Sequence, residues 1–166
     1  MPSFHESVLE YRRQLAKGAI KQAYCGLMEY MMALRTHFAD KYPDHFVSGS
    51  IYFGYMDMTY FSFSPQSLRD RKLKIAVVFL HDTCRFEVWL AAANKQVQAK
   101  YWKLIKDRAW TKYHLVAATQ GADSIVEHVL VEEPGFDDLP ALTRQIEKET
   151  VKFIKDVEGF LAKQPS

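Results

Sequence analysis

The stretch that decides the fold class is residues 73–90, which read LKIAVVFLHDTCRFEVWL. Two apolar runs, both rich in β-branched or aromatic residues, flank a polar tetrapeptide, residues 81–84. Such runs favour strands, and a short polar link between two of them is typical of a hairpin turn. Asp82 can hydrogen-bond back to the local backbone of this turn. The stretch therefore predicts two antiparallel strands.

A third strand is expected upstream, because residues 51–64 read IYFGYMDMTYFSFS. Side chains alternate between the two faces of a strand, so Asp57 would share a face with Tyr55, opposite Tyr60. Both faces would then carry large apolar groups. An antiparallel sheet with one face in water shows a cleaner alternation of apolar and polar residues. We therefore expect either helices on both faces or a second copy of the chain covering one of them.

Helices are predicted at both ends of the chain and after the hairpin. Apolar residues recur at spacings of three and four from Val8 to about Asp40, and Gly18 interrupts them. This spacing indicates a short helix, a break and a longer helix. Asn94 can cap a further helix, and Asp138 opens the last one, with a proline in its first turn.

The remaining segments complete a prediction for the whole chain. We expect a loop over residues 41–50 and a connector with one helical turn over residues 64–72. Two more strands are expected, within residues 111–119 and 124–133. Residues 1–166 are thus predicted to form a single α+β domain. It has an antiparallel four- to five-stranded sheet, N-terminal helices, one inter-strand helix and a long C-terminal helix.

Composition limits the class of protein. The chain has 166 residues, 48% of them hydrophobic, which excludes a disordered or collagen-like chain and argues against several domains. Its 22 basic and 20 acidic residues give a net charge of +2, which supplies no general reason to bind nucleic acid. We find no secretory signal and no apolar run long enough to span a membrane. A cytoplasmic protein without membrane attachment is expected, with Cys25 and Cys84 as buried, unpaired thiols.

A ligand pocket is predicted on the sheet. A carboxylate at position 57, inside an aromatic strand, would be costly if buried without a partner. It is therefore either a ligand-binding or general-base group, or part of a structural ion pair or bulge. Arg85 and Glu87 project from one face of their strand beside Trp89. We predict a pocket formed by Tyr55, Asp57, Arg85, Glu87 and Trp89, for a ligand of unknown identity.

An enzyme is the first alternative to a binding module. Asp57 or Glu87 would then act as acid or base on a small polar substrate. The histidines form no HExxH motif, and the sequence lacks the GxGxxG, GxxxxGK[ST] and GxSxG motifs. No metal and no cofactor is predicted.

A nucleic-acid-associated protein is the second alternative. Basic and aromatic residues interleave over residues 95–113, where Lys100, Trp102, Lys103 and Trp110 could bind phosphates and stack on bases. The other interpretation is that the basic residues form a solvated helix face while the aromatic residues belong to the core. We favour this second interpretation. As partner we expect a second copy of the chain, giving a homodimer.

Three stretches carry a resemblance to a known family: GSIYFGYMDMTYFSFSP at 49–65, KLKIAVVFLHDTCRFEVWLA at 72–91 and KYWKLIK at 100–106. They resemble an uncharacterised family of small bacterial and archaeal proteins, a domain of unknown function, over nearly the whole chain. The resemblance implies no activity, cofactor or site residue. The order of elements is also similar to that of small domains that accompany restriction and DNA-repair enzymes, which is a likeness of architecture alone.

Overall fold

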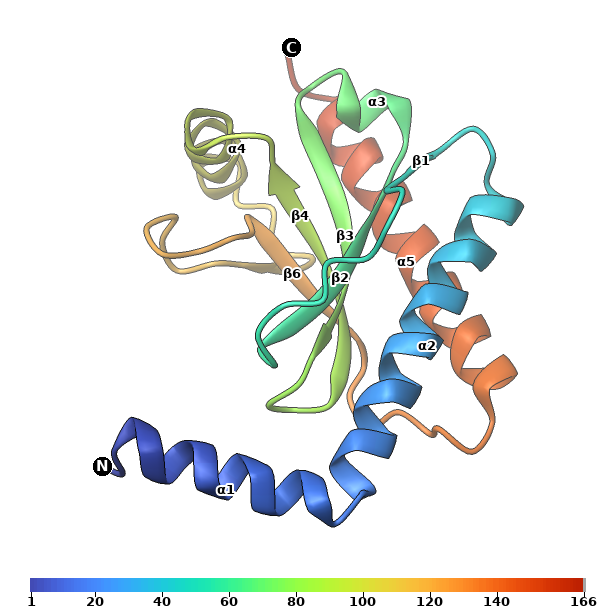
Figure 1. The fold of residues 1–166 in the computed structure, drawn as a ribbon. Coiled ribbons are helices and arrows are strands. Elements are labelled where there is room, and N and C mark those ends of the chain that lie inside the picture. Colours follow the sequence, from blue (N-terminus) through green and yellow to red (C-terminus); the bar gives the residue numbers. More distant parts are fainter. Residues whose placement is uncertain (166) are drawn as a thin grey trace.

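A computed structural model describes residues 1–165, and Figure 1 shows an antiparallel sheet with helices packed on it and the first helix projecting away from it. The α+β class predicted from the sequence is confirmed, with six strands in place of four or five. The elements in chain order are α1 (Phe4–Ala16), α2 (Ala19–Lys41), β1 (Phe46–Val47), β2 (Met58–Ser64), α3 (Gln66–Arg69), β3 (Leu73–Leu80), β4 (Arg85–Ala92), α4 (Lys95–Asp107), β5 (His114–Leu115), β6 (Val126–Val131) and α5 (Leu139–Ala162).

The sheet has the strand order β1-β2-β3-β4-β6-β5, and every neighbouring pair is antiparallel. The predicted hairpin is confirmed, since β3 and β4 pair from Leu73 opposite Ala92 to Leu80 opposite Arg85. The pairing of β4 with β6 shifts its register between Phe86 and Glu87. The sheet therefore carries a β-bulge, which re-aims the side chains next to it.

The predicted strand over residues 51–64 is too long, because β2 begins only at Met58. Gly54 and Met56 have φ angles of +78° and +63°, which turn the chain back on itself. Tyr52 then pairs with Tyr60 across an isolated antiparallel bridge. A Cβ at position 54 would lie 2.0 Å from the carbonyl oxygen of Met58, so this turn requires glycine. We refer to residues 51–57 as the Gly54 turn.

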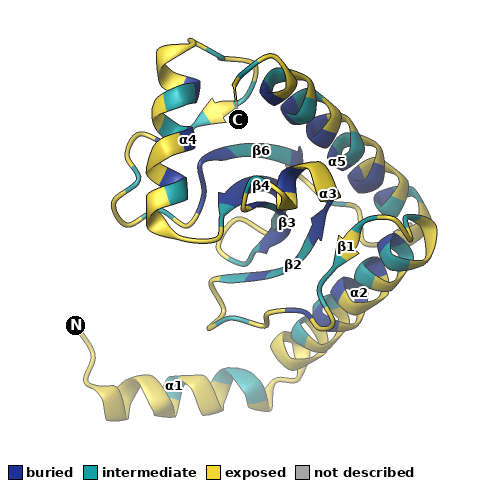
Figure 2. Cartoon of the chain, turned by 90° about the horizontal axis from the view of Figure 1, so that it is seen from above, coloured by how far each residue is buried: buried dark blue, intermediate teal, exposed yellow. Residues whose placement is uncertain are grey.

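Helices lie on both faces of the sheet. This was the first of the two alternatives expected from the sequence. Figure 2 shows α2 and α5 on one face and α4 on the other. On the first face Phe38 of α2 packs against Phe63, with ring centroids 4.6 Å apart. On the second, α4 packs against β4 and β5, and the part formed by β2 and β3 is not covered by a helix. We call this second surface the α4 face.

The break at Gly18 is confirmed, and α1 leaves the body of the molecule there, with φ of +85° at the glycine. Ser3 and Glu6 form a capping box that begins α1. None of the residues of α1 is buried, and the helix projects beside the sheet (Figures 1 and 2).

Smaller differences concern the loops and the cysteines. The expected loop over residues 41–50 contains β1, and the strand expected within residues 111–119 shortens to β5. Cys25 and Cys84 are unpaired as predicted, but both are exposed and not buried. Their positions on the outer surface of α2 and in the β3–β4 turn explain this. Within residues 1–165 no helix combines the length and apolarity required to cross a membrane.

Candidate functional site

Three of the five predicted pocket residues meet on the α4 face of β4. Residues two apart in a strand point to the same face, so Arg85, Glu87 and Trp89 lie in a row. Glu87 is 2% exposed. Its Oε2 accepts a hydrogen bond of 2.7 Å from Arg85 Nε, and its Oε1 accepts one of 2.8 Å from Trp89 Nε1. We call these three residues the Glu87 cluster.

The Glu87 cluster contains a buried carboxylate whose charge is compensated by hydrogen-bond partners. An isolated carboxylate in this position would be strongly unfavourable, whereas one held by a guanidinium and an indole N–H is compensated. The hydrogen bond to Glu87 raises the pKa of Arg85, and Glu132, whose Oε1 lies 3.2 Å from Arg85 Nη1, adds to this rise. The bulge at Phe86 and Glu87 lies directly beside the cluster.

A cavity of about 800 Å³ opens beside the Glu87 cluster, and we call it the α4 cavity. Its walls come from α4, from the segment between α4 and β5, and from β6. The volume falls within the range typical of sites for small organic ligands. The residues that line it are Arg85, Glu87, Ile105, Lys106, Ala109, Trp110, Thr111, Lys112, Tyr113, His114, Leu115, Glu127, His128 and Val129.

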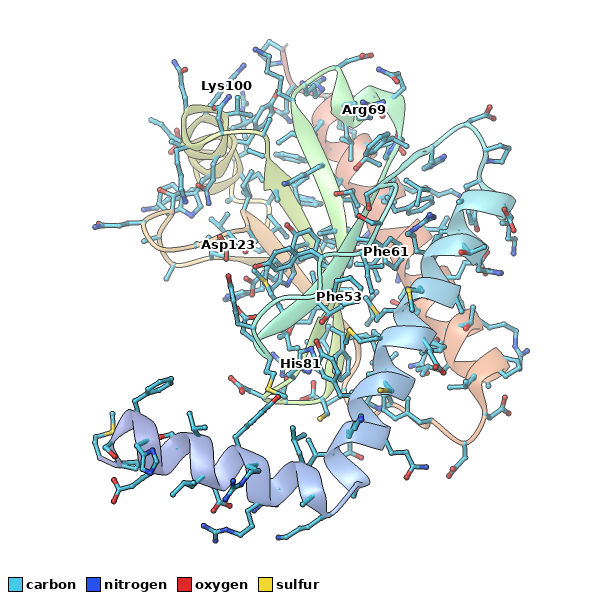
Figure 3. All side chains as sticks on the ribbon, viewed as in Figure 1. Phe53, Phe61, Arg69, His81, Lys100 and Asp123 are labelled. Atoms are coloured by element: carbon cyan, nitrogen blue, oxygen red, sulfur yellow. The ribbon has the colours of Figure 1, made fainter. Side chains whose placement is uncertain are left out.

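A second, smaller hollow of about 250 Å³ lies on the same face, over β2, β3 and β4. Trp89, Tyr60 and two small side chains, Ala76 and Ala91, line it. Asp123, on the loop before β6, also lines it and is labelled in Figure 3. Trp89 contributes to this hollow and donates to Glu87, which lines the α4 cavity. The two hollows are therefore neighbours on one face.

Tyr55 and Asp57 do not line the α4 cavity. Asp57 is exposed, and its Oδ1 accepts a hydrogen bond of 2.9 Å from the backbone N–H of Tyr55. Backbone N–H groups of Tyr55 and Met58 lower the pKa of Asp57. Tyr55 is 90% exposed. The expectation that Asp57 shares a buried strand face is wrong, because the residue belongs to the Gly54 turn and closes it.

His81 attaches the Gly54 turn to the sheet. Its backbone N–H donates to the carbonyl oxygen of Asp57 at 2.9 Å, and its Nε2 lies 2.8 Å from the hydroxyl oxygen of buried Thr59. Figure 3 shows His81 at the end of the sheet nearest α1 and α2, where Tyr24 of α2 stacks on it. Burial lowers the pKa of His81, while Asp57 and Asp82 act in the opposite direction. This role was not predicted from the sequence.

The aromatic residues of segment 95–113 pack within the fold. The indole N–H of Trp102 donates to the carbonyl oxygen of Val116 at 2.8 Å, and Trp110 stacks on Phe160 with centroids 4.7 Å apart. Lys103 pairs with Asp107, while Lys100 lies on the outer surface of α4, where Figure 3 labels it. Both indoles are half-buried. Their contacts are those expected if the aromatic residues of this segment belong to the core.

A second buried carboxylate, Glu147 of α5, was not identified from the sequence. It accepts hydrogen bonds from His37 Nε2, Tyr42 OH and Lys41 Nζ, at 2.8, 2.6 and 2.6 Å. Burial acts to raise the pKa of Glu147, but these donors outweigh it and lower the pKa to about 2. Burial and the neighbouring carboxylate raise the pKa of Tyr42 to about 12. Its partners lie more than a hundred residues away along the chain, so no local motif reveals the cluster.

The described residues offer no ready metal site. Across residues 1–165 no group of three or more His, Cys, Asp or Glu side chains is arranged to hold a metal ion.

The fold and site define an α+β domain whose six-stranded antiparallel sheet carries a partnered carboxylate and a cavity on one face. Residues 4–161 match the model of the family described as a domain of unknown function, DUF7000, and the chain belongs to that family. The resemblance drawn from residues 49–65, 72–91 and 100–106 is thereby confirmed. Neither the curated proteins nor the solved structures include a match.

Proposed function

We propose that this protein is a binding module for a small polar organic ligand, and that the α4 cavity is its binding site. The observation that carries this proposal is Glu87, a carboxylate only 2% exposed and oriented by Arg85 and Trp89 at the edge of the α4 cavity. Glu87 in turn fixes the guanidinium of Arg85, whose side chain is 28% exposed and lines the cavity, so that Arg85 can orient a ligand while the cavity provides contact area.

The lining favours a ligand with both a flat apolar part and hydrogen-bonding groups. Trp110 and Tyr113 offer aromatic surface. Lys106, Thr111 and His114 are exposed and can donate to the ligand. Most residues of the α4 cavity lie far from β4 in the sequence. Of the five residues first predicted, the pocket that we propose therefore keeps only Arg85 and Glu87, while Trp89 holds Glu87 from outside the cavity.

Binding is favoured over acid–base catalysis. Asp57 lies outside the α4 cavity, so it cannot act together with Glu87 there. The second carboxylate of the cavity is Glu127, whose Oε1 accepts from the hydroxyl of Ser124 at 2.6 Å. Both carboxylates are therefore engaged by groups of the protein itself. An acid or base must instead reach a proton of the substrate.

The test compares the wild type with a variant in which the α4 cavity is obstructed. Thr111→Trp adds bulk at an exposed lining position, and Thr83→Trp, in the β3–β4 turn, is the matched control. Small polar aromatic fragments are screened by ligand-observed NMR. We expect hits that bind the wild type and Thr83→Trp but not Thr111→Trp. Hits that bind all three proteins equally would contradict the proposed site.

We also propose a homodimer, with α1 of each copy packed on the other. Apolar residues at Phe4, Val8, Tyr11 and Leu15 share one face of α1, and Phe4 is 86% exposed. A hollow of about 690 Å³, lined mainly by apolar side chains from α1, α2 and Met56, lies at the other end of this stripe. The same chain thus offers an apolar stripe and an apolar hollow, which is what a two-fold interface between identical copies requires.

Light scattering tests the homodimer. We expect a mass about twice the 19.3 kDa of one chain for the wild type, and 19.3 kDa for Val8→Glu, which places a charge in the stripe. Arg13→Glu, on the opposite side of α1, is the control and should stay dimeric. A wild type that is monomeric at micromolar concentration would contradict the proposal. A cytoplasmic location remains part of the proposed function and fits the two free cysteines.

A further inference from the structure

The outer surface of α5 carries a row of basic side chains. Arg144, Lys148, Lys152 and Lys155 are spaced four, four and three residues apart, so they share one helix face. All four are exposed. We call them the α5 basic row. At about 1.5 Å per residue the row extends for about 16 Å along the helix.

The acidic side chains of α5 are not part of this row, because they contact other elements of the fold. Four acids balance the four bases of α5 in the sequence, but each contacts another element of the fold. Glu147 binds His37, Lys41 and Tyr42, Glu149 lies 3.6 Å from His128, Asp156 accepts from Tyr113 and pairs with Lys112, and Glu158 accepts from Ser67. A helix that is neutral in sequence therefore has a basic outer surface.

The basic row has no such partners. Within residues 1–165 none of its four side chains forms an ion pair within 4.0 Å. Lys152 contributes only at longer range, by helping to lower the pKa of Asp156. The row borders a hollow of about 640 Å³ between α5 and the end of α2, where a further basic side chain, Lys41, is paired with Glu147. The acids of this hollow, Glu147 and Asp156, are the two whose charges are already paired.

We propose that the α5 basic row binds the sugar–phosphate backbone of double-stranded nucleic acid. Its cations recur every 4.5 to 6 Å, by an estimate of about 1.5 Å per residue, and they form a line rather than a broad patch. A line of regularly spaced cations suits a line of regularly spaced phosphates. This surface is separate from the α4 cavity and from segment 95–113.

The neighbouring side chains favour a duplex over the other polyanions. The one aromatic residue of the hollow, Tyr42, is half-buried and donates its hydroxyl to Glu147, so it offers no platform for unpaired bases. Val151 is the one apolar residue there and is half-buried. A helix that inserts into a membrane surface needs a larger apolar face.

The experiment measures binding of a labelled short DNA duplex by fluorescence anisotropy over a range of salt concentrations. Four phosphate contacts predict a slope of about −3.6 in log K against log salt concentration. The double variant Lys148→Gln/Lys152→Gln should reduce the slope to about −1.8. The matched control, Lys100→Gln/Lys103→Gln, removes the same charge from α4 and should leave the slope unchanged. Circular dichroism and thermal melting confirm that each variant is folded.

Several results would overturn the proposal. One is an affinity for the duplex that does not depend on salt concentration, and another is the absence of binding at low salt. The third is a folded Lys148→Gln/Lys152→Gln variant that keeps the slope of the wild type. A loss confined to Lys100→Gln/Lys103→Gln would move the site to segment 95–113. Tighter binding to the corresponding single strand, or to phosphatidylserine-containing vesicles, would identify a different class of partner.

Discussion

Two buried carboxylates, Glu87 and Glu147, carry the main electrostatic constraints at the scale of single residues. Each is less than 10% exposed, and each has donors on both oxygens. Removing a donor leaves a charge with insufficient compensation, so the loss is larger than the net contribution of the pair. This asymmetry makes both sites sensitive to substitution of a partner.

Arg85→Met should lower the free energy of unfolding by about 2–4 kcal/mol, because Glu87 stays buried without its guanidinium partner. The range is below that for a fully buried pair, since the side chain of Arg85 is 28% exposed. The double variant Arg85→Met/Glu87→Leu removes the charge as well and should recover part of the loss. Urea denaturation measures both. A double variant less stable than Arg85→Met would contradict this account.

Glu147 should make stability depend on pH at the acid end. Its pKa is about 2 in the folded protein against 4.5 for a free side chain, so the folded state favours the charged form. The stabilisation, about 3 kcal/mol, is present above pH 4.5 and is lost as the pH falls towards 2. Melting temperatures between pH 2 and 7 measure this effect, with Glu147→Gln as comparison. Glu147→Gln should be less stable than the wild type at pH 7 and show a weaker decline in acid, and parallel curves would contradict the prediction.

At the scale of elements, the Gly54 turn shows how local conformation overrides a strand-like composition. Residues 51–57 are as aromatic as β2, and the sequence pattern alone predicts one continuous strand. The positive φ angles at Gly54 and Met56 end that continuity. Asp57 then closes the turn, which is why its carboxylate is in water and not on the core face.

Gly54→Ala should therefore lower the free energy of unfolding by at least about 2 kcal/mol, because a Cβ meets the backbone of Met58 and φ is positive. Gly26→Ala is the matched control. Gly26 lies within α2, and nothing within 4 Å would contact a new Cβ. Alanine should stabilise the helix by about 0.5–1 kcal/mol. Denaturant titration of both variants measures the difference, and equal effects would contradict the role of the turn.

The whole molecule is organised around one hydrophobic core that joins α2, the sheet and α5. A contiguous core of this kind favours a single cooperative unfolding transition. Helix α1 stands apart, since it buries no residue and a helix of 13 residues is marginal by itself in water. The stability of α1 is therefore the property of the molecule that depends most on the proposed dimer.

Thermal unfolding followed by tryptophan fluorescence and by circular dichroism should give one midpoint at a concentration where the dimer is intact. The three tryptophans lie in β4, α4 and the segment after α4, so they report on the sheet and its covering helix. In Val8→Glu the dichroism should also show a gradual loss of helix below the main transition, from unfolding of α1. Separate midpoints for the two probes in the wild type would contradict one cooperative domain.

The sequence by itself determined the class of fold, the helix break at Gly18, the capped starts at Asn94 and Asp138, and the β3–β4 hairpin. These features depend on local spacing, caps and turn residues, which act within a few positions of the chain. Only the tertiary structure decided the start of β2 at Met58, the α4 cavity, the partners of Glu147 and the basic surface of α5. The first depends on positive φ angles at Gly54 and Met56, which the strand-like composition does not reveal. The other three arise because residues distant in sequence pack together, and pairing of opposite charges across such contacts is not encoded in any local pattern.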